Sequence, residues 1–159
     1  MSRISSPYPV TRSIQRALDE ATKRCKARGA SLTPIRRTVL GLLLDEPGGL
    51  KAYDLLDRIK TVHTSATPPT VYRALDFLIE QELAHRVART NQFIACTHDG
   101  HGVACLFLVC PDCDQVTELH DDAALSGLFK CLKQAGHTLA GPEIELSATC
   151  AACSARKNA

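Results

Sequence analysis

Cys110-Pro111-Asp112-Cys113 and, further along, Cys150-Ala151-Ala152-Cys153 carry the strongest structural signal in this chain. In each stretch two thiols are separated by two residues, which is a common spacing for a pair of cysteines on one metal ion. Four thiolates match the tetrahedral coordination of a closed structural Zn²⁺ site, with Zn–S distances of ~2.3 Å. The pairs lie 37 positions apart, wider than the roughly 15–20 residues of a zinc ribbon. The segment between them must therefore fold into a unit that brings its ends together, and we predict a structural zinc on all four cysteines.

The alternative for the two pairs is a redox or disulfide role. Met1–Val10 contains no apolar segment of the kind found in a signal peptide, and no run approaches the ~20 apolar residues of a membrane span. We therefore expect a cytoplasmic protein with no membrane partner. In a reducing compartment, eight Cys and six His favour metal ligation over disulfides.

Charge is distributed unevenly along the chain. Residues 1–89 hold 15 Lys and Arg against 9 Asp and Glu, a net charge of +6, whereas residues 90–159 hold 4 against 8, a net charge of −4. This asymmetry predicts two domains with different partners, a polyanion for the first and divalent cations for the second.

The first half has the pattern of a helix-turn-helix. Apolar residues recur at helical spacing from Ser13 to Gly29, from Pro34 after a Thr33 cap, over residues 52–59 and over residues 68–79. The last of these begins with small polar residues and an Arg, as in a helix that enters the major groove by its N-terminus. Strands over residues 83–87 and 92–96 then form a hairpin wing. We expect residues 1–12 to be a flexible arm and residues 13–89 a winged-helix domain, with the wing continuing to about 97.

Residues 98–159 have a different pattern. They predict strands over 104–109 and 115–119, a helix over 123–135 after Asp121 or Asp122, and a strand around Ile144 and Leu146 that leads to Cys150. The four-cysteine site closes this small α/β unit, and an open sheet edge could pair with a second copy. The fold class expected for the whole chain is α+β.

Several stretches taken together resemble the ferric uptake regulator (Fur) family, in order and without large gaps from about residue 13 to residue 153. They are Leu32-Thr33-Pro34-x-Arg36, Ala52-Tyr53-Asp54-Leu55-Leu56, Pro69-Thr70-Val71-Tyr72-Arg73-Ala74-Leu75-Asp76-Phe77-Leu78 and the two cysteine pairs. Within the family the chain is most similar to the zinc-responsive branch. The resemblance implies a homodimeric repressor that binds A·T-rich inverted-repeat operators when metal-loaded, with a C-terminal dimerisation domain and a structural zinc. It further implies zinc-uptake genes as targets and, on some operators, two dimers.

The resemblance also suggests which side chains meet DNA. Arg73 and Tyr53 align with DNA-contacting residues of the zinc-responsive branch, and an Arg bidentate to guanine contributes ~1–3 kcal/mol of discrimination. Thr70 and Tyr72 accompany Arg73 on the predicted recognition helix, and Arg36 lies in a first helical turn where a nearby phosphate would suit it. The alternatives are a surface salt bridge for Arg73, core packing for Tyr53 and solvated charge for Arg36.

A sensor needs a second metal site, and the resemblance implies that His85, Cys96 and Glu118 are regulatory zinc ligands. In the zinc-responsive branch the fourth ligand is a His seven positions before the residue that corresponds to Cys110, and this chain has Val103 there. His101 in its Gly-flanked loop is the expected substitute, with Cys105 and His98 as rivals. A third site would draw on His98, Asp99 and His101, with His120.

Three other functions stay open at this point. The first is a family member that senses iron, manganese, nickel or peroxide, against which the soft Cys96 thiolate argues. The second is a zinc hydrolase or redox enzyme, for which the sequence has no H-E-x-x-H, no G-x-S-x-G and no Gly-rich phosphate loop. The third is a zinc-stabilised dimerisation module that does not sense metal.

Overall fold

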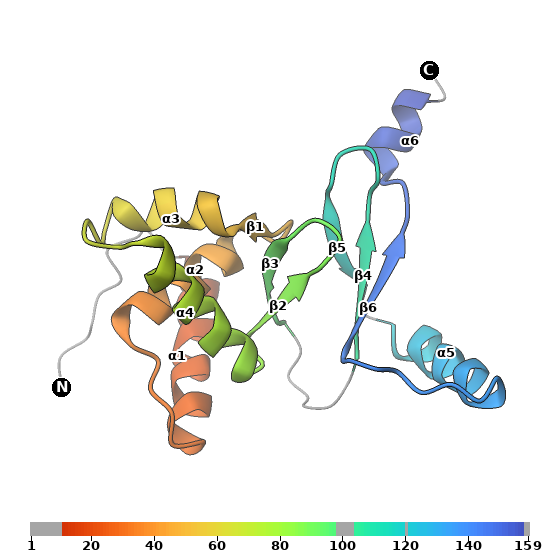
Figure 1. The fold of residues 1–159 in the computed structure, drawn as a ribbon, viewed down its shortest axis with the longest axis horizontal. Helices are drawn as coiled ribbons and strands as arrows, with labels where there is room; N and C mark the ends of the chain where they lie inside the picture. Colours follow the sequence, from red (N-terminus) through yellow and green to blue (C-terminus); the bar gives the residue numbers. More distant parts are fainter. Residues whose placement is uncertain (1–10, 98–103, 120, 158–159) are drawn as a thin grey trace. The chain divides into compact units, whose positions relative to one another are not determined.

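The computed structural model describes residues 11–97, 104–119 and 121–157, and it divides into two compact units (Figure 1). The first unit holds the described residues up to Arg86 together with Asn91–Thr97, and the second holds Val87–Thr90 with the described residues beyond 103. Residues 1–10 of the expected arm, Val103 and the candidate ligands His98, His101 and His120 lie outside the described residues. Across the described ranges, no helix is long and apolar enough to span a membrane.

Four helices make up most of the first unit: α1 (Arg12–Ala27), α2 (Pro34–Asp45), α3 (Ala52–Lys60) and α4 (Pro68–Glu80). Pro34 and Pro68 each open a helix, where proline's fixed φ suits the first turn and its missing N–H costs nothing. Thr33 occupies the N-cap position as expected, but its side chain makes no capping hydrogen bond. The apolar stripes of the four helices meet in one core, whose most buried members include Leu18, Val39, Leu55, Ile59, Leu75 and Leu78.

A three-stranded sheet completes this unit in the order β1-β3-β2, from β1 (Leu50–Lys51), β2 (Ala84–Val87) and β3 (Gln92–Ala95). The sequence does not predict β1, because a two-residue strand has no periodicity and exists only through its antiparallel pairing of Leu50 with Phe93. Gly49 precedes it with a φ of +84°, and a Cβ there would lie 2.9 Å from Cγ1 of Ile94. Three helices, a fourth that follows a turn, and a hairpin constitute a winged helix.

The second unit is a small α/β fold. Its sheet has the order β5-β4-β6, from β4 (Cys105–Val109), β5 (Val116–Leu119) and β6 (Glu143–Ser147), accompanied by α5 (Asp122–Gln134) and α6 (Ala151–Lys157). β5 runs antiparallel to β4, whereas β6 runs parallel to it. The carboxylate of Asp121 caps α5 by accepting a hydrogen bond from the N–H of Ala124 at 2.9 Å. The sequence predicts all of these elements except α6.

The hairpin tip, Val87–Thr90, belongs to this second unit. The half-buried carboxylate of Glu145 on β6 accepts hydrogen bonds from the backbone N–H of Ala88 at 2.6 Å and from that of Arg89 at 3.1 Å. One side chain therefore satisfies two consecutive backbone donors of the turn, and it joins the tip to the β4–β6 side of the sheet.

Candidate functional sites

The four paired cysteines converge because β4 and β6 are parallel. Val109 lies beside Ser147, so the chain leaves both strands at the same end of the sheet, with Cys110 following β4 and Cys150 following β6 shortly afterwards. The sulfur atoms of all four cysteines lie within 4.8 Å of one another; they are Cys110, Cys113, Cys150 and Cys153. We call this cluster the four-cysteine site.

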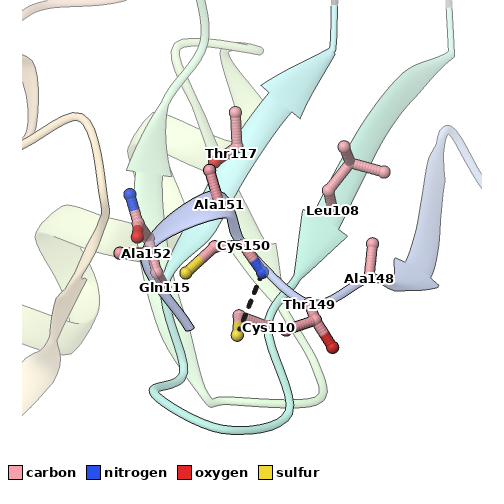
Figure 2. Close-up of a pocket in the computed structure, with 9 residues that line it drawn as sticks. All are labelled: Leu108, Cys110, Gln115, Thr117, Ala148, Thr149, Cys150, Ala151 and Ala152. Atoms are coloured by element: carbon pink, nitrogen blue, oxygen red, sulfur yellow. Dashed lines mark hydrogen bonds between the residues drawn. The ribbon is translucent and has the colours of Figure 1, made fainter. Parts of the chain in front are cut away.

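Its geometry fits a tetrahedral zinc. A Zn–S distance of ~2.3 Å implies a sulfur–sulfur edge of ~3.8 Å, and Sγ of Cys113 lies 3.7 Å from Sγ of Cys150. The backbone N–H of Cys150 also donates to Sγ of Cys110 at 3.4 Å (Figure 2). Figure 2 shows both of these side chains on the wall of a pocket that Leu108, Gln115, Thr117 and Ala148 help to line.

The thiols of this site ionise unequally. The pKa of Cys110 falls to about 6, chiefly because the backbone N–H of Cys150 stabilises its thiolate, with further backbone donors from Asp112 and Cys113. At Cys113 the N–H of Gln115 lowers the pKa, but the contact with Cys153, burial and the contacts with Cys110 and Cys150 together raise it to about 12. Once one thiol of the site has ionised, its negative charge opposes the ionisation of a neighbouring thiol. A cation at the centre is what would allow all four to remain ionised.

Two basic side chains of α6 also reach this site. Nη2 of Arg156 donates to Sγ of Cys153 at 2.7 Å, and Nζ of Lys157 lies 2.8 Å from Oδ2 of Asp112, between Cys110 and Cys113 in the chain. The Cys153 contact raises the pKa of the Arg156 guanidinium. Neither residue is among those that the sequence predicts for the site. Their signal is the spacing of three and four positions after Cys153, which places them on one helical face with it.

The first unit contains two further side chains of kinds that bind metal ions, an imidazole and a thiol. His85 on β2 is only 7% exposed, and Cys96 follows β3, where its backbone N–H donates to the carbonyl of Leu83 at 2.9 Å. A ring nitrogen of His85 lies within 4.8 Å of Sγ of Cys96. An imidazole and a thiol this close can share one ion, and the mixed nitrogen and sulfur donors suit Zn²⁺.

The second unit carries the other described candidates, Cys105 and Glu118. Cys105 is buried at the start of β4, and Glu118 on β5 lies opposite Phe107. Because side chains alternate along a strand, Cys105, Phe107 and Glu118 share one face of the sheet. Cys105 and Glu118 are diagonal neighbours on that face, and the length of a Glu side chain lets both reach one ion.

Three of the DNA-binding candidates are open to solvent. Tyr53 on α3 is 75% exposed, so the core-packing alternative for it is wrong, and Tyr72 on α4 is 48% exposed. Arg73 is exposed one residue further on, and among the described residues it forms no ion pair, so the salt-bridge alternative finds no partner there. Thr70 is half-buried in the first turn of α4, with its hydroxyl oxygen 2.9 Å from that of Thr67.

Arg36 differs from these residues. Its guanidinium carbon lies 3.6 Å from the ring centroid of Phe77, and its Nη1 donates to the carbonyl of Ser31 at 2.7 Å. The side chain is half-buried, and the solvated-charge alternative is therefore wrong for it. Its contacts join the first turn of α2 to α4.

Comparison with known proteins identifies the family of this chain. The ferric uptake regulator family matches residues 27–147. The zinc uptake regulation protein of Escherichia coli (strain K12) is 37% identical over 140 residues, which cover 87% of this chain and 82% of that protein. The chain belongs to the ferric uptake regulator family. Family members regulate transcription and are not enzymes, which sets the hydrolase and redox alternatives aside.

Two solved structures show the same architecture as this Fur-family chain. A zinc uptake regulator complexed with zinc and DNA superposes with a TM-score of 0.79 at 34% identity, covering 94% of this chain and all of that one. The holo form of XcZur has a TM-score of 0.69 at 37% identity and covers 87% of this chain and 96% of that one. These matches confirm the α+β fold, with an N-terminal helical DNA-binding domain and a C-terminal α/β domain. The chain is a metal-responsive transcriptional regulator that resembles zinc uptake regulators.

Proposed function

We propose that this chain is a zinc-responsive repressor that binds A·T-rich inverted-repeat operators as a homodimer when zinc-loaded and represses zinc-uptake genes. The observation that carries this proposal is the buried His85 beside Cys96, a nitrogen and sulfur pair suited to zinc. It occurs in a chain 37% identical to a zinc uptake regulation protein. A sensor of iron or manganese would favour histidine and carboxylate ligands without a thiolate.

The proposal assigns two zinc ions to each subunit. The structural ion takes the four-cysteine site, whose 3.7 Å sulfur–sulfur edge suits it. The regulatory ion takes His85, Cys96 and Glu118, with His101 or Cys105 as the fourth ligand. Burial and a shared sheet face with Glu118 support Cys105, whereas the Gly-flanked loop supports His101. His98 and His120 stay candidates for a further site.

DNA recognition is proposed for the exposed side chains of α3 and α4. Arg73 would pair with a guanine, while Tyr53, Tyr72 and Thr70 would contact bases or phosphates. Where zinc and DNA both favour the same state of the protein, each raises the affinity for the other by the same factor. Phosphate contacts from Lys and Arg would make the DNA affinity fall as salt concentration rises. Some operators would take two dimers.

The test is a titration of A·T-rich inverted-repeat duplex with protein that retains only its tightly held zinc. Buffered Zn²⁺, Fe²⁺ and Mn²⁺ are added in turn, first to the unaltered protein and then to Cys96→Ser. We expect zinc alone to tighten DNA binding and Cys96→Ser to abolish that response. Cys131→Ser, which alters an exposed thiol on α5, is the matched control and should respond as the unaltered protein does.

Two results would contradict the proposal. If Fe²⁺ or Mn²⁺ acts as well as Zn²⁺ at its buffered level, the chain senses another metal. If no metal changes the affinity, the chain is a zinc-stabilised dimerisation module.

The fourth ligand is decided by titrating His101→Ala and Cys105→Ser in the same way. The variant that lacks the true ligand needs a higher free zinc concentration to reach the same DNA affinity.

A further inference from the structure

The four-cysteine site poses a charge problem for the second unit. Four thiolates around one Zn²⁺ carry a net charge of −2, in a part of the chain that already has an excess of acidic residues. Residues 90–159 contain only four basic side chains, which are Lys130, Lys133, Arg156 and Lys157. Two of these four contact the site or the turn that forms it.

α6 places both cations by its helical geometry. Cys153 lies in its first turn, and Arg156 follows three positions later, one turn along the same face. The guanidinium thereby lies 2.7 Å from the Cys153 sulfur. Lys157, the next residue, reaches instead to Asp112 in the turn that carries Cys110 and Cys113. One short helix thus contacts both halves of the site.

We propose that Arg156 and Lys157 are positioning residues of the four-cysteine site, with Arg156 holding the Cys153 thiolate by a charge-assisted hydrogen bond and Lys157 fixing the Cys110–Cys113 turn through Asp112. This inference rests on the structural zinc of the proposed function. Hydrogen bonds to an ionised acceptor are about twice as strong as neutral ones. Partners of this kind orient the ligands of a metal, and their loss typically lowers metal affinity ~10–100-fold.

The two residues are not equivalent. Arg156 acts on a ligand atom itself, so its removal changes the electron density on that sulfur. Lys157 acts through a carboxylate, and its side chain is 59% exposed, so water and salt screen the pair. Exposed ion pairs contribute little, so the loss of this one should change zinc binding at most about fivefold. Arg156 should therefore have the larger effect on the zinc.

The test uses the full chain loaded with zinc, in five forms: unaltered, Arg156→Gln, Arg156→Lys, Lys157→Gln and Lys133→Gln as the matched control on α5. The first readout is the rate at which zinc passes to an excess of a chromogenic chelator. We expect about tenfold faster loss from Arg156→Gln, a smaller change from Arg156→Lys, up to about fivefold from Lys157→Gln, and no change from Lys133→Gln.

The second readout is the thiolate-to-metal charge-transfer band after Co²⁺ replaces zinc. A thiolate that loses its hydrogen bond gives up electron density more readily, so the band of Arg156→Gln should move to lower energy. Arg156→Lys, which keeps a cationic donor, should restore most of the shift. A residue that merely supports α6 would alter zinc loss without moving this band.

The outcomes are distinguishable. If Arg156→Gln and Lys133→Gln release zinc equally fast and give the same band, the inference is overturned while the structural zinc stands. If the unaltered protein and Cys153→Ser hold zinc equally well, the structural zinc itself is wrong, and the proposed function fails in that part. Should Arg156→Gln not fold, Arg156→Ala, which also removes the donor at this exposed position, takes its place, and an unshifted band together with unchanged zinc loss in that variant would equally overturn the inference.

Discussion

Replacing Glu145 by Gln should loosen the hairpin tip without unfolding the second unit. The carboxylate accepts from the N–H groups of both Ala88 and Arg89, at 2.6 and 3.1 Å. A Gln side chain keeps one acceptor oxygen and places an NH₂ group, which cannot accept, against the other N–H. A hydrogen bond to a charged group contributes ~1.5–3 kcal/mol. Because the side chain is half-buried and one bond can persist, we expect a loss of about 1–2 kcal/mol in local stability.

Amide hydrogen exchange by NMR measures this loss at the two donors themselves. A loss of about 1–2 kcal/mol corresponds to roughly 5–30-fold more frequent opening, so the amides of Ala88 and Arg89 should exchange faster by that factor. The amide of Ala148, which donates to the carbonyl of Val109 across β4 and β6, should keep its rate. Glu80→Gln, at an exposed carboxylate of α4, is the control. Exchange within twofold of the unaltered protein at both amides would refute the reasoning.

Four further outcomes test the packing and the sites. Leu75→Ala, at a fully buried position of α4, should lower the free energy of unfolding in urea by ~2–5 kcal/mol, and a loss below 1 kcal/mol would contradict the core assignment. Arg36→Ala should lower it by about 1–2 kcal/mol through the lost Phe77 and Ser31 contacts. Arg73→Ala should leave folding unchanged but weaken discrimination at one base pair by ~1–3 kcal/mol in a competition assay against altered operators. Stripping zinc with a strong chelator should speed exchange at the amide of Ala148 while that of Leu75 keeps its protection, and equal loss at both would refute a local structural role.

The helices of the first unit were predictable because several local signals agree there. Pro34 and Pro68 mark the first turns, and apolar residues at three and four positions mark the buried faces. β1 and α6 were not predictable for a shared reason. A two-residue strand depends on its partner Phe93, and a seven-residue helix is too short to be stable alone. β1 is held by its pairing with a strand distant in sequence, and α6 is held by its side-chain contacts at the four-cysteine site.

The four-cysteine site was only partly predictable. The spacing within each pair indicates metal ligation, but the convergence of pairs 37 positions apart depends on β6 lying parallel to β4. A parallel pairing requires a crossover, here through α5, and no local pattern distinguishes it from an antiparallel return. The sequence therefore indicates that the two cysteine pairs must come together. The parallel direction of β6 shows how they do so and why α6 begins beside Cys150.

Arg36 and Arg73 have similar positions in the sequence pattern but different surroundings in the structure. Arg36 and Arg73 each lie near the start of a helix in the basic half of the chain, and nothing local separates them as DNA contacts. The structure separates them by Phe77, an aromatic ring 41 positions beyond Arg36, over which the Arg36 guanidinium stacks. A cation held there at 3.6 Å has exchanged part of its hydration for the ring and for the Ser31 carbonyl. A phosphate contact by Arg36 would have to compete with these interactions, whereas the exposed Arg73 has no such cost. We therefore expect Arg36 to act on DNA binding mainly by holding α2 against the recognition helix. If Arg36→Ala reduces the salt dependence of DNA binding by about one phosphate contact, as a lost ion pair would, Arg36 contacts a phosphate directly and does not act through α4.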